Sequence, residues 1–133
     1  SAPVTIRNVP SSLIVSSTAT PGTIMAPQAN VSYRVELTNE STVDSITVNQ
    51  ISSSLVGALS NQGSCSLPKT LAPEETYSCQ YTTMVTGNAD TARLNALVVN
   101  GVDDDGDAVE AETAVSVQIV APPIFNIYIP TLQ

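Results

Sequence analysis

A two-residue alternation of apolar and polar side chains is the feature that most constrains the fold of this chain. Residues 31–38 read V-S-Y-R-V-E-L-T, so every second side chain is apolar. Residues 77–82 and 109–119 show a similar period. Successive side chains of a strand point to opposite faces of a sheet, so this period predicts strands with one buried and one exposed face. No segment shows a convincing helical period of about 3.6 residues.

Turn signals separate the predicted strands at intervals of about 8–12 residues. Pro73 stands at a favoured turn position, and residues 87–90 (G-N-A-D) form another turn signal. Residues 100–101 (N-G) and 105–106 (D-G) are hairpin signals. Ala92, Leu94, Ala96 and Val98 form one face of the next strand, and Leu97 and Val99 lie on the other. Apolar residues on both faces indicate a central strand. The pattern predicts an all-β sandwich of about seven antiparallel strands in two sheets.

Length and composition fit one folded domain. The chain has 133 residues, of which 42% are hydrophobic and 4% aromatic, and it has no Trp. We therefore expect a core of Val, Ile, Leu and Ala with a few Tyr. We assign residues 1–11 to a leading strand or linker, residues 12–120 to the sandwich, and residues 121–133 to an apolar C-terminal tail.

The tail carries its own alternation, because residues 124–132 read I-F-N-I-Y-I-P-T-L. The tail has three possible interpretations: an extra edge strand of this sandwich, a strand donated to a neighbouring copy, or an exposed recognition segment. Pro130 limits the length of any strand pairing. The predicted partners are therefore other domains of the same polypeptide, other surface proteins, or a second copy bound through the tail.

The charge distribution disfavours nucleic acid as a partner. Twelve acidic side chains outnumber four basic ones, which gives a net charge of −8. The bases are scattered along the sequence, so we expect no basic patch: they are Arg7, Arg34, Lys69 and Arg93. No apolar run approaches the roughly 20 residues of a membrane-spanning helix, so we expect no membrane insertion.

The residue inventory also disfavours catalysis. The chain has no His, which is the commonest general base and the usual partner of a catalytic Ser or Cys. The adjacent pair Glu74 and Glu75, and the pair Glu110 and Glu112, would suit glycoside chemistry only if buried, and nothing in the sequence indicates burial. We expect a non-enzymatic protein with no catalytic residue.

The two cysteines, Cys65 and Cys79, admit one intramolecular pairing. A bond would close a loop of about 15 residues and stabilise the fold by about 3 kcal/mol. The alternative is two buried thiols in a cytosolic protein. We predict the disulfide, half-buried beside Tyr77 and Tyr81, tying the segment from Ser52 onward to a central strand. Because disulfides persist in oxidising compartments, we expect an extracellular or cell-surface location.

Four aspartates form the densest charge cluster of the sequence: Asp103, Asp104, Asp105 and Asp107. Several carboxylate oxygens on one loop suit Ca²⁺, so calcium is the one cofactor that we predict at this position. The spacing is not that of an EF-hand loop, because Ala108 stands where that loop has its glycine. The alternative is a solvated hairpin tip that binds no metal.

Two further motifs carry weaker signals. N-glycosylation sequons begin at Asn30 and Asn39, and we expect no glycan on either. Lys69 is the only lysine and would be needed for an internal Lys–Asn crosslink, which requires a buried lysine beside a carboxyl group. Its position next to Pro68 predicts an exposed side chain instead.

Several segments in fixed order resemble a large family of immunoglobulin-like repeat domains found in bacterial and archaeal surface proteins. Residues 31–39 (V-S-Y-R-V-E-L-T-N) are similar to its V-x-Y-x-V-x-V-x-N strand. Residues 65–82 (C-S-L-P-K-T-L-A-P-E-E-T-Y-S-C-Q-Y-T) are similar to its C-x-x-P-x-T-L-A-P-G-x-x-Y-x-C-x-Y segment. Residues 101–107 (G-V-D-D-D-G-D) are similar to its G-T-D-D-D-G-N hairpin.

The resemblance spans roughly residues 12–120 and implies an immunoglobulin-like sandwich. It says little about function, because the family is defined by architecture. Glu74 stands where the family has a turn glycine, so the turn there is open to a different type. We expect an extracellular module that acts as a structural spacer, an adhesion domain or a protein-interaction domain. The alternative is a ligand-binding module that depends on calcium or binds carbohydrate.

Overall fold

Nine strands make up the described part of the chain. The structure is a computed structural model, and it describes residues 12–122. No helix occurs among these residues. The strands in chain order are β1 (Leu13–Thr20), β2 (Thr23–Met25), β3 (Gln28–Asn39), β4 (Ile46–Ser53), β5 (Gly57–Ala58), β6 (Lys69–Leu71), β7 (Thr76–Thr86), β8 (Thr91–Asp103) and β9 (Ala108–Val120).

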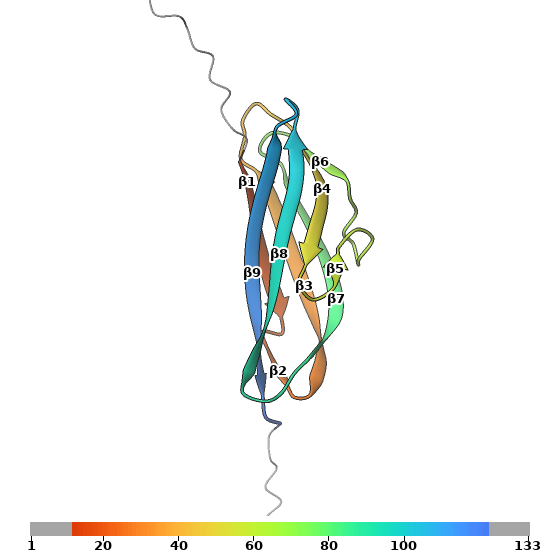
Figure 1. Cartoon of the computed structure of the whole chain (residues 1–133), viewed down its shortest axis with the longest axis vertical. Coiled ribbons are helices and arrows are strands. Elements are labelled where there is room, and N and C mark those ends of the chain that lie inside the picture. Colours follow the sequence, from red (N-terminus) through yellow and green to blue (C-terminus); the bar gives the residue numbers. More distant parts are fainter. Residues whose placement is uncertain (1–11, 123–133) are drawn as a thin grey trace, which may run out of the picture.

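The strands form two sheets that pack face to face (Figure 1). The three-stranded sheet has the order β1-β3-β7. The six-stranded sheet has the order β2-β9-β8-β4-β5, with β6 also paired to β4. In immunoglobulin lettering, β1, β3 and β7 correspond to strands A, B and E, while β9, β8 and β4 correspond to G, F and C. The prediction of an all-β immunoglobulin-like sandwich is confirmed.

The strand count and one pairing differ from the prediction of about seven antiparallel strands. There are nine strands in the described residues, and β2 runs parallel to β9, with Thr23 opposite Gln118 and Met25 opposite Val120. Between β1 and β2 the chain passes from the three-stranded sheet to the other sheet at Pro21 and Gly22. The direction of β2 depends on contacts with residues distant in sequence. The unpredicted strands have only two or three residues, which is too short to show an alternation.

The core lies between the sheets and consists of inward side chains from both. Val, Ile and Leu dominate it as predicted, but the alanines lie only at its border. The rings of Tyr33 and Tyr81 stack across the β3–β7 pair with centroids 5.4 Å apart. The largest fully buried side chains are Tyr33, Leu37, Ile46, Ile51, Leu59, Leu71, Leu97, Ile119, Val31, Val35, Val48 and Val85.

A buried polar chain links the two sheets through β8, which is a central strand as its two apolar faces predict. Asn95 of β8 is fully buried, and its Nδ2 donates to the hydroxyl of Tyr81 in β7 at 2.7 Å. The hydroxyl of Ser53 in β4 donates to Asn95 Oδ1 at 2.5 Å. Polar side chains of three strands are therefore hydrogen-bonded to one another inside the core, where an unpaired polar atom would lower the stability of the fold.

Glu74 occupies a left-handed turn position with φ of 65°. The N–H of Glu75 donates to the carbonyl of Ala72 at 2.9 Å, which closes a four-residue turn around Pro73 and Glu74. Pro at the second position and positive φ at the third are the features of a type II turn. Glu74 therefore adopts a left-handed conformation that glycine most readily occupies.

The described chain enters and leaves the sandwich at opposite ends. β1 begins at the upper end of the molecule in Figure 1, and β9 finishes at the lower end. β9 has 13 residues, which span about 43 Å at roughly 3.3 Å per residue. The polypeptide thus traverses the long axis of the module between Ser12 and Pro122.

Candidate functional site

Asp103 closes the acidic hairpin between β8 and β9. It is 4% exposed, and its Oδ1 accepts the backbone N–H groups of Asp105 at 3.0 Å and of Asp107 at 2.9 Å. Its carbonyl accepts the N–H of Gly106 at 3.0 Å, and Gly106 has a left-handed φ of 86°. Glycine adopts such a φ without a steric penalty, so the D-G signal marks the tip of the hairpin correctly.

The structure regroups the aspartates that were predicted to bind calcium. Carboxylate oxygens of Asp44, Asp103 and Asp105 lie within 4.8 Å of one another. The group includes neither Asp104 nor Asp107, and Asp104 Oδ2 accepts the backbone N–H of Ser45 at 3.2 Å. Asp44 was missed because it precedes β4, far from the hairpin in sequence, and no local pattern marks it.

Carboxylate repulsion shapes the electrostatics of this cluster. The charge of Asp44 is the largest cause of a raised pKa at Asp105, followed by partial desolvation and then by the other aspartates of the hairpin. Three grouped carboxylates can offer oxygens to a hard cation. Ca²⁺ takes about six to eight oxygen ligands, however, and hydrogen bonds within the hairpin already engage Asp103 Oδ1. Hairpin closure accounts for Asp103, and calcium binding stays a prediction.

Cys65 and Cys79 are joined by a disulfide with their Cα atoms 4.9 Å apart. The predicted surroundings were partly wrong. Both cysteines are almost fully buried, not half-buried, and β7 is an edge strand of its sheet, not a central one. The segment before Cys65 lies on that edge, because the N–H of Ser64 donates to the carbonyl of Gln80 at 2.9 Å.

Gly63 allows this segment to approach β7 closely. A Cβ at this position would lie 2.0 Å from the carbonyl oxygen of Gln80, and the φ of Gly63 is 55°. Tyr77 fixes the other side of the loop, since its hydroxyl accepts the N–H of Ser66 at 3.0 Å. The disulfide is therefore a structural staple between a long connection and the sheet edge.

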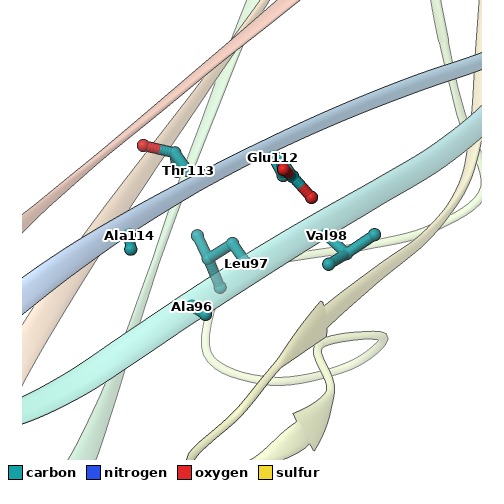
Figure 2. A pocket seen from close by; sticks show the side chains of 6 residues that line it. All are labelled: Ala96, Leu97, Val98, Glu112, Thr113 and Ala114. Carbon is teal, nitrogen blue, oxygen red and sulfur yellow. The ribbon is translucent and has the colours of Figure 1, made fainter.

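A shallow depression of about 390 Å³ lies over the β8–β9 pair (Figure 2). One charged side chain, Glu112, lines it together with Thr113 and aliphatic residues. Glu112 is exposed, as is Glu110 on the same strand. This lining offers no nucleophile paired with a base, so the depression has no recognisable catalytic chemistry.

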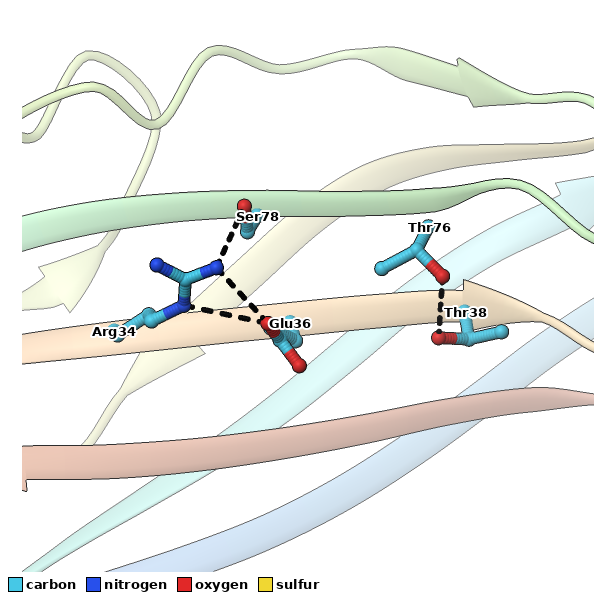
Figure 3. A network of polar contacts seen from close by, with 5 residues as sticks. All are labelled: Arg34, Glu36, Thr38, Thr76 and Ser78. Carbon is cyan, nitrogen blue, oxygen red and sulfur yellow. Dashed lines mark hydrogen bonds and ion pairs between the residues drawn. The ribbon is translucent and has the colours of Figure 1, made fainter.

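The outer face of the three-stranded sheet carries a row of polar contacts (Figure 3). Arg34 Nη2 lies 3.0 Å from Glu36 Oε2 and also reaches the hydroxyl of Ser78 at 3.4 Å. The hydroxyls of Thr38 and Thr76 are 3.0 Å apart across the β3–β7 pair. These contacts are exposed, and exposed ion pairs contribute little to stability, so this face is a flat polar surface and not a built site.

The remaining candidates from the sequence are the two glycosylation sequons and Lys69. Asn39 is fully buried, and its Nδ2 donates to carbonyls that include that of Leu71 at 3.1 Å, which leaves no room for a glycan. Asn30 is exposed. Lys69 lies in β6 rather than in a loop, with Nζ 3.8 Å from Glu75 Oε2 and 36% of its side chain exposed. Glu75 Oε1 accepts the N–H of Ala72 at 2.8 Å.

No protein-family model matches this sequence, and the search of curated proteins gives no match. Among solved structures, the chain is similar to an X-ray structure of a Northeast Structural Genomics Consortium target, with 14% identity and a TM-score of 0.46 over 86% of this chain and 89% of that one. It is also similar to the putative ApaA protein from Bordetella pertussis, with 16% identity and a TM-score of 0.44 over 86% of this chain and 95% of that one.

Proposed function

We propose that this chain is a non-enzymatic extracellular module that acts as a spacer in a surface or secreted protein. The resemblance of residues 31–39, 65–82 and 101–107 to immunoglobulin-like repeats of surface proteins supports this proposal. The buried disulfide supports the location, because such bonds persist outside the reducing cytosol. Among the described residues no helix is long and apolar enough to cross a membrane.

The observation that carries the proposal is the passage of the chain from one end of the module to the other. β1 begins at one end and β9 finishes at the opposite end (Figure 1). Modules connected in this way add their long axes, so a polypeptide of several copies would extend by about 40 Å per module. A domain whose two ends lay together would add little length.

The pairing of β2 with β9 suits such a module to tension. Pulling the chain apart along its axis drives the two strands in opposite directions, and their ladder is loaded all at once. Beyond the ladder itself, the N–H of Ala26 donates to the carbonyl of Val120 at 2.8 Å, and the N–H of Gln118 donates to that of Gly22 at 3.0 Å. A ladder loaded together resists force better than one whose bonds break in turn.

Small-angle X-ray scattering on two full chains linked in series tests the spacer role. We expect the maximum dimension of the tandem to exceed that of the single chain by about one module length, roughly 40 Å. The control for association is the single chain at twice the molar concentration, which contains the same number of modules without the covalent link. A tandem that folds back to the maximum dimension of one module would contradict the proposal.

A calcium-dependent module is the second candidate, favoured by the grouped carboxylates of Asp44, Asp103 and Asp105. If Ca²⁺ binds there, millimolar CaCl₂ should raise the melting temperature above that in NaCl of matched ionic strength, because a ligand that binds the folded state stabilises it. Asp44→Asn should abolish the rise, whereas Glu110→Gln, which removes an exposed charge outside this group, should preserve it. An equal melting temperature in both salts removes this candidate.

A further inference from the structure

The sandwich has several sheet edges, and most of them are protected against further pairing. β5 has two residues and β2 has three, the latter flanked by Pro21 and Pro27. β1 packs alongside β9 of the opposite sheet. Short edge strands, prolines and covered edges all prevent unwanted strand addition. β7 is the long edge strand of the three-stranded sheet, with eleven residues.

Only part of the β7 edge is covered by the chain itself. The N–H of Gln80 donates to Ser64 Oγ at 2.8 Å, and its carbonyl accepts the N–H of Ser64 at 2.9 Å. The backbone groups of Gln80 therefore point away from β3. In an antiparallel pair this direction repeats at every second residue, so those of Thr82 and Met84 point the same way. Within residues 12–122 neither makes an outward backbone hydrogen bond.

This open part of the edge also lacks the features that normally block pairing. Residues 82–86 read T-T-M-V-T, with no charge, no proline and no glycine. Met84 is 48% exposed, and Thr82 is exposed beside it. An uncharged edge with unpaired N–H and C=O groups is a template for an added strand.

The chain itself contains a segment with the matching chemistry outside the described residues. Residues 124–129 read I-F-N-I-Y-I, without charge, proline or glycine. Ile, Phe and Tyr have high strand propensity, and uncharged segments of about six such residues readily add to open strands. Pro123 and Pro130 bound the segment, so its length is close to that of the open β7 edge.

The position of this segment favours pairing with a second copy. The N–H of Asp90, in the turn that follows β7, donates to the carbonyl of Ile119 at 2.7 Å, so β7 and β9 end at the same end of the sandwich. Pairing with its own β7 would require the chain to reverse directly after β9. Ala121 and Pro122 each precede a proline, which favours extended backbone at that point.

We propose that residues 124–129 of one copy add as a strand to the open edge of β7 in a second copy. The segment and the edge are different surfaces, so the contact is head-to-tail and continues from copy to copy until a ring closes. This inference goes beyond the spacer role and does not depend on it: failure of the docking leaves the length of a single module unchanged.

Analytical ultracentrifugation of the full chain over a range of concentrations tests the docking. The average mass should rise with concentration, and Ile127→Asp should keep the protein monomeric by placing a charge in the added strand. Met84→Lys should do the same by placing a charge on the accepting edge. Leu94→Lys is the matched control, since Leu94 is 54% exposed on β8, away from this edge, and it should associate like the parent.

Thermal unfolding of each variant guards against loss of the fold, and all three variants should keep the melting temperature of the parent at low concentration. A parent that is monomeric at every concentration would overturn the inference. Equal weakening by Leu94→Lys and Met84→Lys would overturn it as well, because the effect would then follow net charge and not the edge.

Crosslinking identifies which chain supplies the strand. Met84→Cys and Asn126→Cys are introduced into separate chains, which are mixed and oxidised. A disulfide between the two chains is the expected product. A double variant that crosslinks only within one chain, with no product in the mixture, would show that the segment folds back on its own β7 and would contradict the second-copy assignment.

Discussion

Asn95 shows at the residue scale how the core constrains its polar groups. It bridges Ser53 of one strand and Tyr81 of the opposite sheet, and it is fully buried. Asn95 shares the buried face of β8 with Leu97 and Val99. Because both faces of this strand carry apolar residues, the sequence indicates neither which face is buried nor a partner for the amide. The partners come from strands 42 and 14 residues away in sequence, so only the folded arrangement reveals them.

Asn95→Ala should lower the free energy of unfolding by about 1–3 kcal/mol, because it leaves buried hydroxyls without their partner. Urea unfolding measures the change. Asn100→Ala, on the same strand but half-buried, removes the same amide and should cost less. Equal losses in the two variants would show that the bridge does not contribute specifically.

Asp105 makes the stability of the folded protein depend on pH. Repulsion from Asp44 raises its pKa in the folded state. The folded protein therefore binds this proton more tightly than the unfolded chain does. The stability contribution is fully present below the ordinary Asp pKa and is lost as the pH rises through the raised value.

Asp105→Asn should consequently stabilise the protein at neutral pH and leave its stability unchanged in acid, below the ordinary Asp pKa. Unfolding curves of parent and variant at the two pH values measure this difference. Glu110→Gln removes one exposed charge outside the cluster and serves as the control. A variant that is less stable than the parent at neutral pH would contradict the repulsion.

At the element scale, the long alternating strands could be read from the sequence and the short ones could not. β3, β7, β8 and β9 have eleven or more residues, enough for the period to be recognised. The crossing of the chain from β1 to β2 and the parallel pairing of β2 depend on contacts distant in sequence. For the same reason Asp44 was absent from the predicted acidic cluster, although the hairpin that supplies its partners was recognised.

The disulfide is the element-scale staple of the long connection between β4 and β7. Replacing both cysteines, Cys65→Ser with Cys79→Ser, should lower the free energy of unfolding by about 3 kcal/mol, as expected for a loop of about 15 residues. Reduction of the parent should give a similar loss. Proteolysis should then cut first between β5 and β6, since the segment that includes Gly63 would no longer be held to β7.

An unchanged free energy of unfolding after the double replacement would contradict the staple role. Cleavage elsewhere, for example in the β8–β9 hairpin, would show that the connection is held by other contacts, such as the hydrogen bond from Ser66 to Tyr77.

At the scale of the whole molecule, the described chain traverses the sandwich from end to end, and β2 pairs in parallel with the last strand, β9. This arrangement supports the proposal that the module bears tension along its long axis. The acidic hairpin lies at the end where β1 begins, because Ser45 beside β4 binds Asp104 and the loop after β3 binds Ser12. Force applied between Ser12 and the hairpin would therefore act on one end of the molecule and peel strands apart in turn.

Single-molecule pulling in two directions tests the tension-bearing spacer most directly. Handles are attached through Ser12→Cys and Pro122→Cys in one protein, and through Ser12→Cys and Asp105→Cys in the other. Pulling between positions 12 and 122 loads the parallel β2–β9 strand pair in shear and should require the higher unfolding force. An equal or lower force in that direction would contradict the proposal that this module carries tension along its long axis.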